Sequence, residues 1–204
     1  MQWKLYYHEN STFARRVRIA AEEKQIQLEA IRVRMERREH KREDFLKLNP
    51  YGRVPVLVTE DGRSIYESIP ILFLLEDLFP EHPLMSRDPL ERALMHNRLQ
   101  ICDLEFAIPC TKIYFQKRFF PEERWDREAF AEAEKRIAPH LQLLGAELQE
   151  HEYLVGDAFS LAEVAYLPFL AFRDLLQCEI PPSVERWAER LLKRPSALAT
   201  QPTR

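Results

Sequence analysis

The change in hydrophobic pattern at Pro80 constrains the fold more than any other feature of this sequence. Before Pro80, short aromatic or β-branched runs alternate with segments of helical spacing, whereas after Pro89 the apolar residues recur at helical spacing alone. A chain that changes period in this way is predicted to have an α/β domain followed by an all-α domain. We therefore predict domains over residues 1–80 and 89–204, joined by a proline-containing linker over residues 81–88.

The first 80 residues predict a mixed sheet. The expected order is strand, helix, strand, short helix, strand, strand and helix, over residues 3–7, 13–24, 28–33, 43–48, 54–59, 63–66 and 69–79. The first strand–helix–strand unit implies parallel pairing, because crossovers of this kind join parallel strands. Asp61-Gly62 is a hairpin turn signal and implies an antiparallel pair at one edge.

The second half of the chain predicts helices throughout. They are expected over residues 90–117 with a bend at Pro109, 127–149 with Pro139 inside, 160–176 and 183–194. The segment 115–126, which combines phenylalanines, Pro121 and several charges, fits either a substrate lid or a partner surface. The sequence does not choose between these two interpretations.

Composition excludes several classes of protein. The net charge is −3, so the chain as a whole is not an electrostatic nucleic-acid binder. The longest apolar run is too short to cross a membrane, and the first residues lack the apolar core of a signal peptide. Three cysteines without a CxxC pair predict neither a disulfide framework nor a zinc site. These features favour a reduced, intracellular compartment and a protein without a metal.

Three short segments carry candidate chemistry, and each also has a purely structural interpretation. Val54-Pro55 opens a buried-looking strand, so Pro55 is either an ordinary edge proline in trans or a cis proline at a special turn. Glu67-Ser68 precedes an apolar helix, where Ser68 fits an N-cap or an anion site. Ser11 and its neighbour Thr12 stand at the start of the first helix and fit the same two roles.

Together these segments resemble the cytosolic glutathione transferases, and the resemblance covers nearly the whole chain. Ser11-x-x-Ala14-Arg15-Arg16-Val17-Arg18 is similar to the active-site turn of the serine-type classes (theta, zeta and many bacterial forms). Asn49-Pro50-x-Gly52-Arg53-Val54-Pro55 is similar to the family's cis-proline stretch, Glu67-Ser68 to its γ-glutamyl-binding pair, and Ser160-Leu161-Ala162-Glu163 to its helical capping box. The resemblance implies a thioredoxin-like N-terminal domain and an all-helical C-terminal domain.

The resemblance also implies an enzyme that binds glutathione and presents its thiol as a thiolate to a hydrophobic electrophile. A free thiol has a pKa of about 8.5, so the protein must stabilise the thiolate preferentially. The motif implies that Ser11 donates this hydrogen bond. Thr12 is a fallback, and Tyr7 is a competitor because other classes use a tyrosine at the end of the first strand. No cysteine lies near position 11, so the cysteine-type reactions are not expected.

The remaining glutathione contacts are likewise implied by the resemblance. Val54, before Pro55, is expected to pair its backbone with the cysteinyl amide, and Glu67 with Ser68 to take the γ-glutamyl end. His40 is expected at the glycyl carboxylate, with Lys41 and Arg53 as cationic alternates. The family further implies a cytoplasmic homodimer, in which Asp103 reaches the partner's glutathione. The alternative is a non-catalytic binding or regulatory protein of the same fold, of the stringent-starvation type.

Overall fold

The computed structural model describes residues 3–202. Contacts divide the chain into two compact units, which are described separately. The first contains the residues up to Leu84 together with those from Pro195 onward, and the second contains Met85–Arg194. The predicted combination of an α/β and an all-α part is confirmed. The predicted domain limits at residues 80 and 89 stay a prediction, and the grouping of the C-terminal segment with the first unit was not expected.

The first unit is built on a four-stranded sheet in the order β2-β1-β3-β4. Its strands are β1 (Lys4–Tyr7), β2 (Glu29–Arg32), β3 (Val56–Val58) and β4 (Ser64–Tyr66). β1 and β2 pair in parallel, whereas β3 pairs antiparallel with both β1 and β4. The parallel crossover and the antiparallel hairpin predicted from Asp61-Gly62 are therefore both present.

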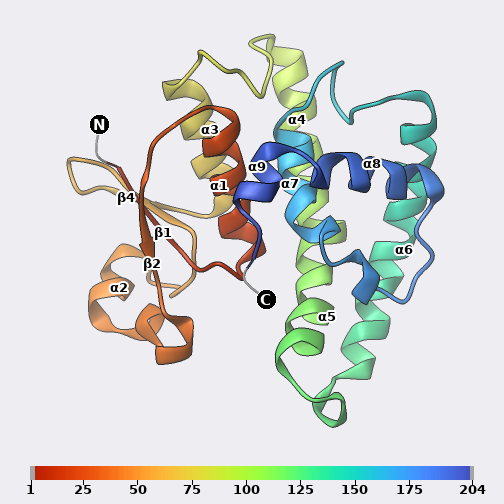
Figure 1. The fold of residues 1–204 in the computed structure, drawn as a ribbon, viewed down its shortest axis with the longest axis horizontal. Helices are drawn as coiled ribbons and strands as arrows, with labels where there is room; N and C mark the ends of the chain where they lie inside the picture. The colour runs from red at the N-terminus through yellow and green to blue at the C-terminus, as the bar shows by residue number, and fades with distance from the viewer. Residues whose placement is uncertain (1–2, 203–204) are drawn as a thin grey trace. The chain divides into compact units, whose positions relative to one another are not determined.

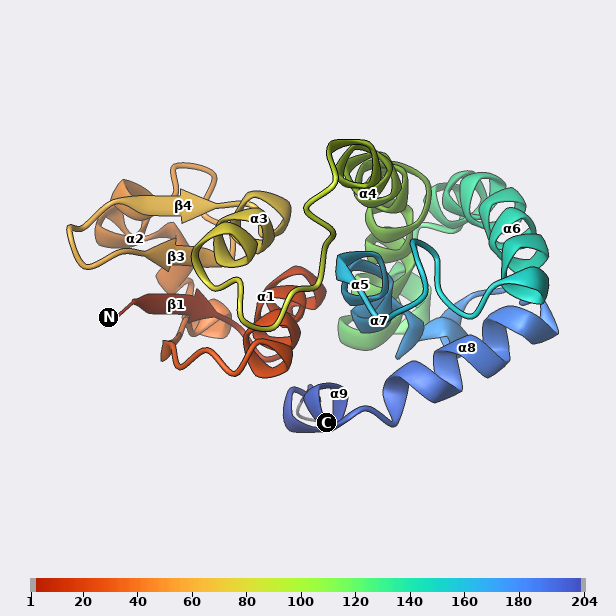
Figure 2. The same cartoon turned by 90° about the horizontal axis from the view of Figure 1, so that it is seen from above.

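Helices cover both faces of this sheet (Figures 1 and 2). On one face, α1 (Thr12–Glu23) and α3 (Ser68–Leu78) contribute Val17, Ile71 and Leu75 to a buried cluster with strand residues Leu5 and Leu57. On the other face, Phe45 of α2 (Glu43–Leu48) lies with its ring centroid 6.1 Å from that of Tyr6. Two short helical turns, η1 (Met35–Arg37) and η2 (Glu39–Lys41), link β2 to α2.

The second unit is helical, as predicted. Its α-helices are α4 (Pro89–Ile101), α5 (Ile108–Phe119), α6 (Arg127–Glu150), α7 (Leu161–Leu170) and α8 (Pro182–Leu192), with short turns η4 (Glu122–Arg124) and η5 (Arg173–Leu175). All ten residues of α7 are buried, which identifies it as the central helix of this unit. The capping box predicted at Ser160 and Glu163 is present at its start.

The long helix predicted over residues 90–117 is interrupted earlier than expected. Instead of a simple bend at Pro109, a π-helical segment, η3 (Cys102–Ala107), separates α4 from α5. Pro109 lies in the first turn of α5 and has no N–H to donate to the preceding turn. The backbone N–H of Ile108 donates to the carbonyl of Asp103, five residues back, which is the π-type bond.

A short C-terminal helix, α9 (Pro195–Ala199), packs on α1 within the first unit (Figure 1). The buried Arg15 guanidinium donates to the carbonyl of Ala197 at 3.0 Å and to Oγ1 of Thr200 at 3.4 Å. Ser196 Oγ donates to the carboxylate of Glu23. These contacts fix the outer side of the helix that begins just after Ser11.

Candidate active site

The strand register brings the three candidate segments to one end of the sheet. Tyr6 pairs with Val56, and Val56 pairs with Tyr66 across the antiparallel hairpin. The residues after β1, before β3 and after β4 therefore lie at the same end, which places the Ser11, Pro55 and Glu67 segments together. The parallel pairing of β1 with β2 brings the segment that leads to His40 to this end as well.

Ser11 is the N-cap of α1. Its backbone is extended, with φ −81° and ψ 112°, and its Oγ accepts from the backbone N–H of Ala14 at 3.2 Å. The capping interpretation is therefore correct. Because the Ser11 oxygen accepts in this bond, its hydroxyl hydrogen has no acceptor among residues 3–202. The Ser11 hydroxyl can therefore donate to a ligand. Ala14, one turn further on, packs in the same buried cluster as Val54.

Tyr7 and Thr12, the two alternatives to Ser11, flank the same turn. Tyr7 is the last residue of β1, and the Arg18 guanidinium lies over its ring, 4.9 Å from the centroid. Thr12 is the first residue of α1. All three hydroxyl groups come from one six-residue segment, so position in the fold does not select among them.

The Val54-Pro55 peptide bond is cis. The turn before it is held by Asn49, which is almost fully buried. Its Nδ2 donates to the carbonyl of Arg53 at 2.9 Å, and its Oδ1 accepts from the N–H of Tyr51 at 3.0 Å. Within the described residues, no hydrogen bond engages the backbone N–H or C=O of Val54. These two groups are free to pair with an extended peptide, as the family resemblance implies.

Gly52 brings η2 against this turn. Its φ is +60°, and a Cβ at this position would lie 2.6 Å from the carbonyl oxygen of His40. Lys41 Nζ donates to the carbonyl of Tyr51 at 3.3 Å, and Arg53 is exposed. The structure therefore brings His40, Lys41 and Arg53, the three candidates for the glycyl carboxylate, close together.

His40 differs from its cationic neighbours in charge. Burial, with smaller contributions from Lys41, Arg38 and His8, lowers the pKa of His40. Its Nδ1 is buried and has no hydrogen-bond partner among the described residues. The imidazole is thus mainly neutral at pH 7, and the positive charge near this turn comes from Lys41 and Arg53.

Glu67 and Ser68 occupy the start of α3, but not with the expected capping geometry. Glu67, rather than Ser68, is the N-cap, with φ 71° and ψ 132°, and its side chain makes no capping bond. Ser68 is the first helical residue, and its buried Oγ accepts from Nη1 of Arg16 at 3.3 Å. The prediction that Ser68 caps this helix is therefore wrong, because its oxygen faces a buried guanidinium. The exposed Glu67 carboxylate is available to a ligand ammonium group.

Sequence reasoning missed the supporting roles of Arg16 and Asn49. Both stand inside the quoted motifs, yet both are buried, at 0% and 1% exposure. Polar residues of these types are usually exposed, so burial of either side chain could not be read from its identity. The available signal was position, since Arg16 lies one turn after Thr12 and Asn49 ends α2.

Two expectations fall in the second unit. Asp103 lies in η3, so the geometry of the first unit says nothing about its predicted contact with a partner's glutathione. In the segment 115–126, Phe115 and Phe119 are about half exposed, and their ring centroids are 5.3 Å apart. Arg118 lies over the ring of Phe172 at 4.1 Å. The choice between a lid and a partner surface stays open.

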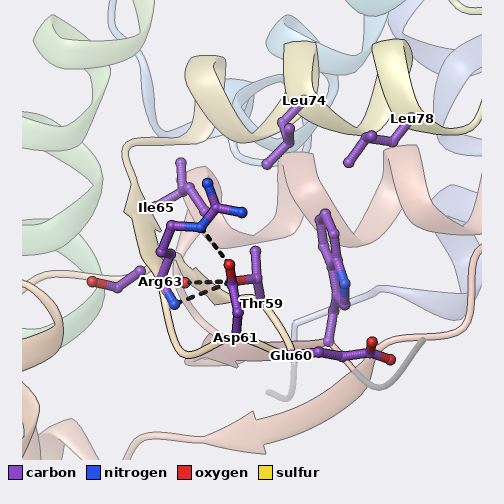
Figure 3. A pocket seen from close by; sticks show the side chains of 9 residues that line it. Thr59, Glu60, Asp61, Arg63, Ile65, Leu74 and Leu78 are labelled. Atoms are coloured by element: carbon purple, nitrogen blue, oxygen red, sulfur yellow. Dashed lines mark hydrogen bonds and ion pairs between the residues drawn. The ribbon is translucent and has the colours of Figure 1, made fainter.

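A pocket of about 710 Å³ opens at the opposite end of the sheet from these residues. Figure 3 shows Thr59, Asp61 and Arg63 of the β3–β4 hairpin below Leu74 and Leu78 of α3. Arg63 Nε lies 2.8 Å from Oδ2 of Asp61, so its charge is already partnered. Arg63 is the one cation among the nine residues that line the pocket, and Asp61 already pairs with it, so this lining offers no second cation for a ligand with two carboxylates. The chemistry of the side chains therefore identifies the other end of the sheet as the candidate site.

No group of three or more His, Cys, Asp or Glu side chains within residues 3–202 is arranged to hold a metal ion. No helix in the same range is both long and apolar enough to span a bilayer.

Comparisons with known proteins agree with this geometry. Residues 10–78 match the family model described as the glutathione S-transferase N-terminal domain, and residues 104–195 match the model of the C-terminal domain. Glutathione S-transferase 2 of Saccharomyces cerevisiae is 30% identical over 191 residues, which cover 89% of this chain and 82% of that protein. Glutathione S-transferase F6 of Arabidopsis thaliana is 30% identical over 205 residues, covering 95% and 96%.

Among solved structures, glutathione transferase F2 from Populus trichocarpa is similar over 97% of this chain and 96% of its own. The TM-score is 0.87 and the sequence identity 26%. The two family models together match well over half of the sequence, and they occur in the same order as the two units. The chain belongs to the cytosolic glutathione S-transferase family.

Proposed function

We propose that Ser11 supplies the hydroxyl group that stabilises the thiolate of glutathione in this glutathione transferase. The observation that carries the proposal is the position of Ser11 at the N-terminus of α1, with its hydroxyl hydrogen left without an acceptor among residues 3–202. A preorganised donor of this kind stabilises developing negative charge, and the N-terminal end of a helix adds to the effect. The proposal makes the protein a serine-type transferase.

Glutathione would bind along the end of the sheet that carries these residues. The open backbone groups of Val54, before Pro55, pair with its cysteinyl part. Glu67 and Ser68 take the ammonium and carboxylate of the γ-glutamyl end, and His40, Lys41 and Arg53 take the glycyl carboxylate. Support comes from the register of the strands and from the contrast between the exposed Glu67 and the buried Ser68. The thiolate then attacks a hydrophobic electrophile.

The first test is the titration of the bound thiol, followed by ultraviolet difference absorbance. We expect its pKa in the wild-type complex to lie well below the free value of about 8.5. Ser11→Ala should raise this pKa and lower the rate of conjugation on the order of 10–1000-fold, with glutathione affinity changed only several-fold. Thr12→Ala and Tyr7→Phe are the matched controls. An unchanged rate in Ser11→Ala, with a large loss in either control, would transfer the role to that residue.

A homodimer is also proposed, in which Asp103 of one subunit reaches the glutathione of the other. Light scattering at micromolar concentration should then give about twice the chain mass of 24.3 kDa. If so, Asp103→Asn should weaken glutathione binding in the dimer, because the ammonium group loses a carboxylate partner. A monomer at this concentration would contradict both parts of the proposal. We place the enzyme in the cytoplasm and its domain boundary at residues 81–88.

The non-catalytic alternative is not favoured, because the curated relatives carry transferase names. A non-catalytic protein would give no thiolate absorbance at saturating glutathione, whether or not glutathione binds. The thiol titration of the wild-type protein therefore separates the two functions before any variant is made.

A further inference from the structure

The two adjacent arginines of α1 have different partners in the fold. Arg15 and Arg16 are both buried, at 3% and 0% exposure. Arg15 points to the C-terminal segment, where it donates to Ala197 and Thr200. Arg16 instead donates to the hydroxyl oxygen of Ser68, at the first residue of α3. Burying a guanidinium is costly unless its hydrogen bonds are satisfied, so both contacts should be required by the native fold.

The direction of the Arg16–Ser68 hydrogen bond determines what Ser68 can do. Guanidinium groups only donate, so the Ser68 oxygen is the acceptor in this 3.3 Å contact. The single hydroxyl hydrogen of Ser68 is then directed away from Arg16, and it has no acceptor among residues 3–202. A hydroxyl whose oxygen accepts from a cation is polarised and becomes a stronger donor. Ser68 is therefore prepared to donate to an anion.

The surroundings of Ser68 favour an anion at the same place. Ser68 begins an eleven-residue helix whose N-cap, Glu67, makes no side-chain capping bond, so the first amide groups of α3 are not used for capping. The Arg16 guanidinium lies behind Ser68 and also stacks over Phe13, 5.0 Å from the ring centroid. Phe13 and Arg16 belong to the first turns of α1, so one buried cation links the Ser11 helix to the start of α3.

We infer that Arg16 is a positioning residue that orients the Ser68 hydroxyl toward the γ-glutamyl carboxylate of glutathione. The inference rests on the proposed function, since it assigns a role within the same binding site. Arg16 itself does not touch the ligand. Its effect passes through Ser68, so it should act on binding of the carboxylate end and not on the reaction of the thiol.

The test compares two variants of adjacent residues. Arg16→Met should weaken glutathione binding, measured by calorimetry, on the order of tenfold or more, the size expected for a lost charge-assisted hydrogen bond. The rate at saturating glutathione should stay within about threefold of wild type. Arg15→Met is the matched control, because it removes an equally buried guanidinium from the same helix. We expect its glutathione affinity to stay within about threefold of wild type.

A glutathione analogue without the γ-glutamyl α-carboxylate, 4-aminobutanoyl-cysteinylglycine, separates positioning from general damage. Arg16→Met should bind this analogue as well as the wild-type protein does. Ser68→Ala should show the same pattern, and the double variant should be no worse than the weaker single variant. Equal losses for both ligands, or equal losses in Arg15→Met and Arg16→Met, would overturn the inference.

Arg16→Lys covers the case in which Arg16→Met does not fold. It keeps a cation and a donor, so it should bind glutathione more weakly than the wild-type protein does and bind the analogue equally well. An Arg16→Lys protein that is weakened equally toward both ligands contradicts the inference. Failure of the proposed function can be told apart from failure of this inference, because the wild-type protein itself would then show no glutathione binding.

Discussion

At the scale of single residues, two glycines with positive φ show how local geometry is tied to the site. Gly52 has φ +60° and no room for a Cβ, because the carbonyl of His40 would lie 2.6 Å away. Gly62 has φ +83°, and a Cβ there would meet nothing within 4 Å. The two positions share the backbone requirement and differ in the close contact, which makes them a matched pair.

We predict that Gly52→Ala destabilises the protein more than Gly62→Ala. Gly62→Ala should cost about 1 kcal/mol, the cost of a positive φ alone. Gly52→Ala should cost about 2–4 kcal/mol, because steric displacement of the His40 backbone is added. Urea unfolding of the two variants measures the difference in the free energy of unfolding. Equal losses of stability would show that the His40 backbone moves aside at no cost. Gly52→Ala should also weaken glutathione binding.

Contacts of single side chains could be predicted from the sequence only in part. The cap at Ser11 was predicted correctly, because serine is a favoured residue just before the first turn of a helix. The cap at Ser68 was wrong, because the unusual backbone of Glu67 moves the helix start and leaves Ser68 facing Arg16. Local sequence does not record which distant side chain will supply a partner, so the Arg16–Ser68 pair could not be predicted.

At the scale of elements, α1 is fixed at its C-terminal end by a buried ion pair. Lys24 is the C-cap of α1, and its Nζ donates to Glu76 of α3 at 2.9 Å and to the carbonyl of His82 at 2.8 Å. The Lys24 side chain is fully buried, and that of Glu76 is 5% exposed. Glu76 also accepts from the backbone N–H of Leu84. One carboxylate thus joins α1, α3 and the segment that leaves the first unit.

Lys24→Met is expected to cost about 3–5 kcal/mol, because it leaves the Glu76 carboxylate buried without its cation. The comparison is Lys47→Met in α2. There the ion pair with Glu43, at 3.0 Å, is exposed on both sides and should contribute about 0.5 kcal/mol or less. Guanidinium chloride unfolding checks both values. A Lys24→Met protein of wild-type stability would mean that Leu84 and water satisfy Glu76 alone.

Element types were more predictable than element ends. The order of strands and helices followed from periodicity, since a change of period separates the two halves of the chain. The sequence predicted a bend in this helix but not the π-helical segment η3. Pro109 signals that a helix is disturbed, but its sequence position does not show that the preceding turn adopts π geometry.

At the scale of the whole molecule, the second unit contains a titratable group with a strong effect on stability. His140 of α6 is 5% exposed, and its Nε2 lies 2.9 Å from the hydroxyl oxygen of Tyr166 in α7. Burial, with a smaller contribution from the charge of Arg98, lowers the pKa of His140 to about 4. The folded protein therefore holds this imidazole neutral down to about pH 4.

We predict a loss of stability on acidification that depends on His140. Between pH 6.5 and pH 4 the unfolded chain binds a proton at this imidazole and the folded chain does not, so stability falls as the pH falls. The full effect is about 3 kcal/mol, complete near pH 4. Unfolding free energies of wild type and His140→Gln between pH 7.5 and 4.5 test it. Parallel pH profiles for the two proteins would exclude His140 as the cause.

The packing of α9 on α1 has a consequence for how the protein is made. Among residues 3–202, the Arg15 guanidinium donates to Ala197 and Thr200, which the ribosome adds 182 and 185 residues after Arg15. The first unit therefore completes its packing only after the whole second unit has been synthesised, although most of its residues are made first. A premature stop codon just before Pro195 would leave the Arg15 guanidinium without either of these two acceptors.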